Sequence, residues 1–373
     1  MQHNVGRLVL LAVLTAVPSF AQEVRTKFNP KVHGFMFVNS FKNDVVPSVN
    51  ISTGGLCGGM VYAAMDYFLG PGNATRMDYR PQVGSTLEQY IYGRQVTSLA
   101  SNLDRWTDVS LTNPTGARNA ELFNRGLLTE QRLGEVRKSI DSGTPALLGL
   151  APMNGGGLGH QVLAIGYDYG RYQGKLGDFK EDLRLFIYDP NLPGEVSVLR
   201  PDVNGQCYTL AGENGQPNSR WLTYFVDTRF AKAAPPAIAD PDPGKDGLVR
   251  ELLVQINTGG DDLRGNNDNA QLSVKIEGLP TETYELNNRR HWLAFYDQTV
   301  RIPLKSPTRV ESIRSIEITT NFARGVNPEA WAVDRVFVRA RGGGVPDRTL
   351  NDVNGAPVVY FTTDRKSYVL EFP

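Results

Sequence analysis

The spacing of apolar residues changes near residue 143. Residues 57–69 (CGGMVYAAMDYFL) carry apolar side chains at the spacing of one helical stripe, and residues 88–103 and 129–141 are predicted as further helices, with Thr129 capping the last. A first strand is expected around Phe35, Phe37 and Phe41. After the helices, short apolar runs bounded by Gly, Pro and Asp predict strands at 145–150, 161–167 and 183–188. Helices followed by an antiparallel sheet indicate an α+β domain.

The rear of the chain has a different pattern. Residues 231–247 (AKAAPPAIADPDPGKDG) are rich in Pro and Ala without periodicity, which is typical of a linker. Beyond them no helix is predicted, and short strands are expected at 252–256, 271–276, 299–304, 315–320, 332–338 and 358–361. This pattern predicts an all-β sandwich domain. The expected division is therefore 1–21, 22–230, 231–247 and 248–373.

The first 21 residues are expected to lie outside the fold. Arg7 precedes an apolar run at 8–17, Pro18 breaks it, and Ala21 offers a small residue for a signal peptidase. We interpret this segment as a secretory signal removed after Ala21; the alternative is an uncleaved anchor, for which the run is short. No later segment is long and apolar enough to span a membrane, so a secreted or periplasmic protein is predicted.

Composition narrows the function. Hydrophobic residues make up 40% and charged residues 21% of the chain, which is ordinary for a globular protein. Lys and Arg total 39 and Asp and Glu total 39, so no basic surface that follows a phosphate backbone is expected, and nucleic acid is not a predicted partner. Two cysteines, Cys57 and Cys207, are too few for a disulfide-built scaffold, although a single bridge between them is one alternative.

Cys57 lies at the beginning of the first predicted helix, within GGLCGGM. The unpaired N–H groups of a helix N-terminus stabilise a thiolate, and flanking glycines allow a substrate to approach. The Cys57 N–H is then placed to face a developing oxyanion. A nucleophilic thiol needs a base, and His160 opens a strand after a glycine-rich loop. If that strand pairs with the next, Asp189 or Asn191 can orient the imidazole.

These motifs resemble a known superfamily. A Cys at the start of the first core helix, followed by GHQVLAIGYD and IYDPN, is similar to the papain-like cysteine peptidases, in particular the branch of bacteriocin-processing (double-glycine) peptidases. The separations, 160 − 57 = 103 and 189 − 160 = 29, suit that fold. The resemblance covers about residues 30–228. It implies Cys57 as nucleophile, His160 as general base and acid, Asp189 as orienting residue, and no cofactor.

The chain departs from this family in one respect. Members usually carry a Gln a few residues before the Cys to complete the oxyanion hole, but no Gln lies between Gln22 and Cys57. Asn50 is the nearest amide before the cysteine, and its carboxamide can donate the same kind of hydrogen bond. Asn50 is therefore predicted as the oxyanion donor.

The rear domain offers a candidate metal loop. Residues 259–269 are dense in oxygen ligands, and Asp261, Asp262 and Asp268 are candidate ligands for a structural Ca²⁺; a solvated turn is the alternative. The stretch VQINTGGDDLRGNNDNAQLSVKI and the later WAVDRVFV resemble lipoxygenase-type (PLAT-like) sandwiches. That resemblance implies contact with a surface, lipid or glycan.

Two functions are consistent with these patterns. The first is an exported papain-like thiol hydrolase that cleaves or transfers a peptide or isopeptide amide through Cys57, His160 and Asp189, with a peptide or protein as substrate. Deamidation and transglutamination use the same residues. The second is a non-catalytic secreted binding or adhesion protein, in which the sandwich carries the function on an inactive papain-like scaffold.

Overall fold

A computed structural model describes residues 23–46, 51–53, 55–153, 159–212, 215, 217–238, 240, 244–324 and 328–373. The predicted signal segment, its cleavage position and Asn50 lie outside these residues. Within the described part of the chain, no helix combines the length and apolar character needed to cross a membrane.

The front of the chain is helical. Its central helix, α2 (Cys57–Leu69), is apolar on nearly every face, because it packs against helix α3 on one side and a sheet on the other. Helix α3 begins where Ser85 accepts a hydrogen bond from the Glu88 N–H at 3.4 Å. The described helices of this region are α1 (Pro30–His33), α2, α3 (Thr86–Ser101), α4 (Leu103–Trp106), the π-helical turn η2 (Thr107–Leu111), α5 (Asn119–Arg125) and α6 (Arg132–Asp141).

A closed antiparallel barrel follows. Its strands are β4 (Ala146–Pro152), β5 (His160–Asp168), β6 (Arg184–Tyr188), β7 (Ser197–Asp202), β8 (Cys207–Ala211) and β9 (Pro217–Val226). They pair in the order β5-β4-β9-β8-β7-β6, and a further pairing of β6 with β5 closes the ring. The short strand β1 (Val24–Arg25) adds to β5, a 3₁₀ turn (Lys180–Asp182) precedes β6, and β2 (Asn43–Val46) pairs with β3 (Ile51–Thr53). Closure leaves the barrel without open edges.

Successive side chains along a barrel strand point to opposite faces, and both faces are packed, which explains why the strands are apolar along their length. Leu148 and Leu150 of β4 point into the barrel, whereas Leu147 between them packs towards α2. On β5, Val162 points inward and Leu163 points towards the helix. Both faces are therefore buried, and α2 is held against the outer face of the barrel.

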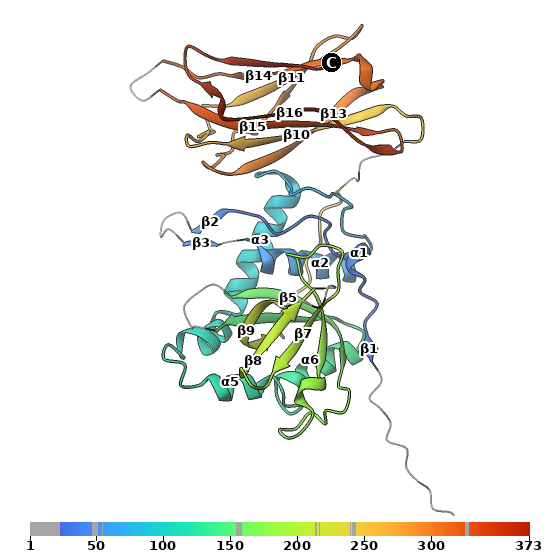
Figure 1. Cartoon of the computed structure of the whole chain (residues 1–373), viewed down its shortest axis with the longest axis vertical. Coiled ribbons are helices and arrows are strands. Elements are labelled where there is room, and N and C mark those ends of the chain that lie inside the picture. Colours follow the sequence, from blue (N-terminus) through green and yellow to red (C-terminus); the bar gives the residue numbers. More distant parts are fainter. Residues whose placement is uncertain are drawn as a thin grey trace, which may run out of the picture.

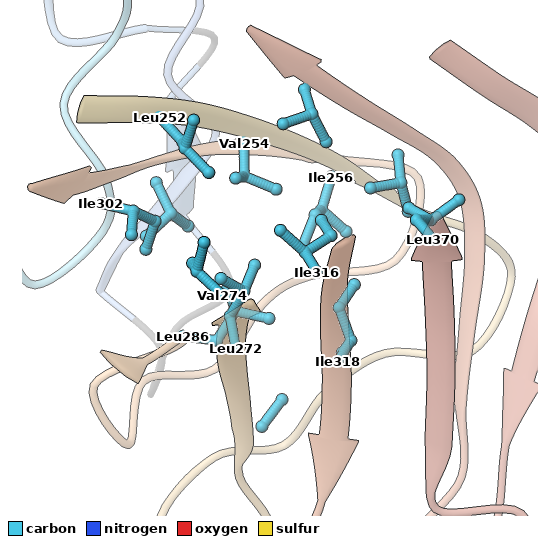
Figure 2. Close-up of a cluster of buried hydrophobic side chains, with 14 of the residues drawn as sticks. Leu252, Val254, Ile256, Leu272, Val274, Leu286, Ile302, Ile316, Ile318 and Leu370 are labelled. Atoms are coloured by element: carbon cyan, nitrogen blue, oxygen red, sulfur yellow. The ribbon is translucent and has the colours of Figure 1, made fainter. Parts of the chain in front are cut away.

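The rear domain is a β-sandwich of two four-stranded antiparallel sheets. One sheet has the order β13-β10-β15-β16 (Asp297–Thr308, Val249–Thr258, Trp331–Gly342, Val345–Phe361). The other has the order β12-β11-β14-β17 (Glu282–Glu285, Ala270–Ile276, Ile313–Thr320, Ser367–Glu371). Figure 2 shows Leu252, Val254 and Ile256 of one sheet facing side chains of the other across the core. The described sandwich contains one short 3₁₀ turn, Val310–Ser312.

The two domains lie end to end, with the sandwich next to α3 and the β2–β3 hairpin (Figure 1). No helix or strand occurs among the described residues between β9 and β10, and this segment lies along α2: the Tyr67 hydroxyl donates to the Pro236 carbonyl at 2.7 Å. Arg341 of the sandwich binds both oxygens of the Asp78 carboxylate at 2.9 Å. The Val83 N–H donates to Gln298 Oε1 at 3.2 Å. The sandwich is thus docked on the front domain by polar contacts.

Three local predictions were wrong. Residues 35–41 form no strand; they run as irregular chain whose phenylalanines pack under α2. Thr129 is not the cap of α6, which begins at Arg132 after Gln131, because the Thr129 hydroxyl donates to the Gly174 carbonyl instead. The helix expected over 88–103 breaks at Asn102, whose side-chain amide donates to Ser98 O at 3.0 Å and to Asp227 Oδ2 at 2.8 Å.

Candidate active site

Cys57 is the first residue of α2. The preceding Leu56 has no capping side chain, so the entrance of the helix is left open to the thiol. Gly55 adopts φ +116°, a conformation that disfavours other residues, and a Cβ there would lie 2.5 Å from Asn39 Nδ2. Asn39 Oδ1 in turn accepts the Leu56 N–H at 2.7 Å. Glycine at position 55 therefore lets Asn39 hold the chain that delivers Cys57.

His160 is the first residue of β5, opposite Leu150 of β4. Its side chain is buried, and Nε2 lies 2.8 Å from Asp189 Oδ1. The imidazole also stacks on the Trp221 ring, with centroids 5.8 Å apart and an angle of 24° between the planes. Because Nε2 is bound to the carboxylate, Nδ1 is the ring nitrogen available to the thiol.

Asp189 follows the last residue of β6. The predicted pairing of the two strands is present, with Leu163 opposite Tyr188, and it brings Asp189 beside His160. Asp189 is 3% exposed, and its Oδ1 also accepts the Asn191 N–H at 2.8 Å. Asn191 Nδ2 lies 3.4 Å from His160 Nε2. Both residues named as candidates for orienting the base therefore contact it, and the carboxylate is the closer.

Cys57 and His160 shift each other's pKa. Burial by itself raises the pKa of Cys57, but the hydrogen bond and charge of His160 and the backbone N–H groups of Gln161 and Gly58 outweigh it, so the pKa is below its usual value. Burial by itself lowers the pKa of His160, but Asp189 and then Cys57 raise it to about 10. These shifts favour a thiolate–imidazolium pair.

The alternative of a disulfide does not apply, because Cys57 and Cys207 are both free. Cys207 is buried on β8, where its sulfur lies 3.2 Å from Arg220 Nη2. Burial raises the pKa of Cys207, which leaves it a poor nucleophile at neutral pH. The two thiols of the chain thus have opposite character.

Several contacts of the site were missed in the sequence. Asn50, predicted as the oxyanion amide, lies outside the described residues, and Asn39 is one of the described amides near the cysteine. Its Nδ2 donates to Asn191 Oδ1 at 3.1 Å, across 152 positions in the chain. Asn39 lies in the segment where a strand was expected and none forms, and Trp221 lies in a strand that was not predicted, so no local signal pointed to either. Gln161, by contrast, belongs to the GHQVLAIGYD motif and packs against Gly58.

The predicted calcium ligands lie in the sandwich domain. Asp261 accepts a hydrogen bond from the Tyr360 hydroxyl at 2.7 Å, and Asp262 is bonded to His291. In the described residues, no three His, Cys, Asp or Glu side chains come close enough to hold a metal ion. Neighbouring strands and loops bind two of the three carboxylates, Asp261 and Asp262, and the Ca²⁺ site expected at Asp261, Asp262 and Asp268 stays a prediction.

Comparison with known proteins identifies no family for the chain. No family model matches it, and no curated protein matches it. Among solved structures, it is similar to the alpha-toxin of a Clostridium perfringens avian strain (16% identity, TM-score 0.27), covering 36% of this chain and 34% of that one. An alpha-toxin of Clostridium absonum gives 20% identity, a TM-score of 0.23 and 32% coverage of both chains. A LOX variant in complex with arachidonate gives 17% identity and a TM-score of 0.25, covering 33% of this chain and 16% of that one.

These similarities are confined to about a third of this chain and a third or less of each matched chain. The β-sandwich itself is described by the strand order and core above, independently of them. The papain-like resemblance of the front domain is untested by these comparisons and stays a prediction.

Proposed function

We propose that the chain is an exported thiol hydrolase of papain-like type, which cleaves or transfers a peptide or isopeptide amide. The observation that carries this proposal is the juxtaposition of Cys57, His160 and Asp189: a thiol at a helix entrance and a buried imidazole shift each other's pKa, and a buried carboxylate lies 2.8 Å from the imidazole Nε2. Nucleophile, base and orienting group in contact is the arrangement that covalent acyl transfer requires.

The reaction follows from these contacts. The Cys57 thiolate attacks the carbonyl carbon, and the negative charge moves to the carbonyl oxygen, where we place the Cys57 N–H as donor. The His160 imidazolium gives its proton to the leaving nitrogen as the C–N bond breaks, which leaves an acyl-thioester. Neutral His160 then takes a proton from water, or from an acceptor amine, as that group attacks the thioester. The products are an acid or a new amide, and the Cys57 thiolate and His160 imidazolium are restored.

Selective alkylation tests the proposal without a known substrate. Iodoacetamide should modify Cys57 rapidly at about pH 5.5, where an ordinary thiol is protonated and slow. Cys207 in the same molecule is the internal control, and mass spectrometry of the two peptides gives both rates. A Cys57→Ser variant should lose hydrolysis of a mixed peptide library. If iodoacetamide modified Cys57 and Cys207 slowly and at the same rate, the proposed enzymatic function would lose its basis.

The alternative, a binding protein that acts through its sandwich, is favoured by one observation. A polar cavity of about 580 Å³ lies on the β12-β11-β14 sheet, and its lining includes the buried Thr320 hydroxyl, which finds no hydrogen-bond partner among the described residues. The lining residues are Asn269, Gln271, Glu285, Asn288, Arg289, Thr319, Thr320 and Asn321. Amide, hydroxyl and charged groups match a hydroxyl-rich glycan better than a lipid.

A matched pair of substitutions tests this second function. Gln271 lines the cavity, and Lys275 lies on the same strand and the same face outside it. If the cavity binds a glycan, calorimetry with soluble cello- and chito-oligosaccharides should detect binding that Gln271→Ala weakens and Lys275→Ala does not. Absence of heat with both series, or equal effects of the two variants, would speak against a glycan site here.

A further inference from the structure

We propose that Tyr296 of the sandwich is a positioning residue for the thiol–imidazole site, acting through Asn39 of the front domain. The inference rests on the proposed function, because it assigns the second domain a part in the same chemistry. It is carried by hydrogen bonds from Tyr296 to residues 40 and 42, and by hydrogen bonds from the adjacent Asn39 to the residues next to Cys57 and Asp189.

The series begins at the sandwich, where Tyr296 is 8% exposed and inserted against residues 40–42 of the front domain. Its hydroxyl accepts the Lys42 N–H at 3.0 Å and donates to the Ser40 carbonyl at 3.3 Å. The Lys42 ammonium donates to the neighbouring Phe295 carbonyl at 2.8 Å. Two backbone groups of the front domain thus bind one hydroxyl of the rear domain.

Arg80 reinforces this contact from the front domain. Its guanidinium lies 4.2 Å from the centre of the Tyr296 ring, and its Nη1 donates to the Ser40 carbonyl at 2.8 Å. Nη2 also lies 3.2 Å from the Asp297 carboxylate. Because Arg80 is buried and bound on both sides of the interface, residues 40–42 are held between the two domains.

The next residue towards the N-terminus is Asn39, which connects this held segment to the site. Its N–H donates to the Pro190 carbonyl at 3.0 Å, and its Nδ2 donates to Asn191 Oδ1 at 3.1 Å. Its Oδ1 accepts the Leu56 N–H at 2.7 Å, one residue before Cys57. Asn39 therefore binds both the segment that carries the thiol and the segment that follows Asp189.

These contacts matter because covalent catalysis depends on small displacements. A misplacement of about 1 Å between reacting groups can cost on the order of a hundredfold in rate. Asn39 fixes the distance between the α2 entrance and the β6 end, and Tyr296 limits the movement of the segment on which Asn39 sits. Removal of the Tyr296 hydroxyl should loosen the thiol–imidazole contact without touching either group.

The test uses the whole chain and needs no substrate. Tyr296→Phe keeps the ring and removes the hydroxyl, and Asn39→Ala removes the connecting amide. In both variants iodoacetamide should modify Cys57 about fivefold more slowly at about pH 5.5. This factor corresponds to the loss of one hydrogen bond that aligns the site. Their rate–pH profiles should also move to higher pH, because a weaker contact with His160 lowers the thiolate fraction. A purely structural role would lower the melting temperature and leave that profile in place.

Two control variants separate positioning from general weakening. Tyr360→Phe removes a sandwich hydroxyl bound to Asp261 within the same domain, and Asp78→Asn weakens docking through Arg341 without contacting residues 39–42. Both should keep the wild-type alkylation profile. If Tyr296→Phe and Asn39→Ala keep it too, the positioning role is wrong even though wild-type Cys57 reacts fast. If wild-type Cys57 is itself slow, the proposed function fails instead.

Discussion

His160 Nε2 and Asp189 Oδ1 lie 2.8 Å apart, although 29 positions separate His160, which begins β5, from Asp189, which follows the neighbouring strand β6. Both side chains are buried, so their interaction is shielded from water and stronger than that of an exposed pair. The carboxylate therefore controls both the orientation of the imidazole and its charge.

Asp189→Asn should raise the pH at which Cys57 becomes reactive. His160 has a raised pKa, so its imidazolium persists up to about pH 10, and Cys57 has a lowered pKa. The thiolate–imidazolium pair thus exists between the lowered pKa of Cys57 and about pH 10. Without the Asp189 carboxylate the pKa of His160 falls and the pKa of Cys57 rises, so the pH range in which the pair exists becomes narrower. We expect iodoacetamide modification at about pH 5.5 to fall on the order of tenfold. Asp202→Asn, beside Cys207, is the control and should leave the Cys57 profile unchanged.

Gly58→Ala should destabilise the front domain, whereas Gly93→Ala should not. A Cβ at Gly58 would lie 1.9 Å from Gln161 Oε1, which is itself fixed by a hydrogen bond from Ser98 at 2.7 Å. Forced overpacking of this kind costs about 1–3 kcal/mol of unfolding free energy. Gly93 lies in α3 with open space around it, so alanine there should be neutral or stabilising by about 0.5–1 kcal/mol. Urea titrations of both variants would contradict this account if Gly58→Ala were the milder change.

Asp66→Ala should be strongly destabilising. Asp66 is completely buried on α2, and its carboxylate binds Arg94 of α3 at 2.7 Å, the Tyr90 hydroxyl at 2.7 Å and the Ala233 N–H at 2.8 Å. Removing one partner of a buried pair leaves the other charge uncompensated, which costs about 3–5 kcal/mol. The exposed pair Arg324–Asp364 gives the comparison, and Asp364→Ala should leave the melting curve essentially unchanged. Similar losses in both variants would argue against a buried pair at Asp66.

Chelation should not affect the sandwich. No cluster of three acidic, His or Cys side chains suited to a metal occurs in the described chain, and the candidate loop carboxylates are already bonded to Tyr360 and His291. We therefore expect the same melting temperature in excess EDTA and in millimolar-range Ca²⁺. A clear rise of the melting temperature with Ca²⁺ would show that backbone and amide oxygens complete a site that acidic side chains alone do not.

Local periodicity predicted much of the fold, whereas Cys57, His160 and Asp189 were predicted from their residue types and from the motifs around them. Helix α2 and strands β5 and β6 follow from apolar spacing, and Cys57, His160 and Asp189 lie at their ends. Strands β12 (ETYE) and β17 (SYVLE) were missed because they are short and partly polar. Asn39 and Trp221 were missed for a different reason: each contacts the site from a position far away in the sequence, and nothing in the nearby residues marks such a contact.

Closure of the barrel also determines which parts of the site can move. Because β5 and β6 are paired neighbours in a closed barrel, moving the imidazole away from its carboxylate would require the hydrogen bonds between the two strands to break along their length. The thiol is not part of that ring; it is carried by a helix that rests on the outer wall. Any movement within the site should therefore displace the Cys57 sulfur relative to His160, while His160 and Asp189 keep their positions.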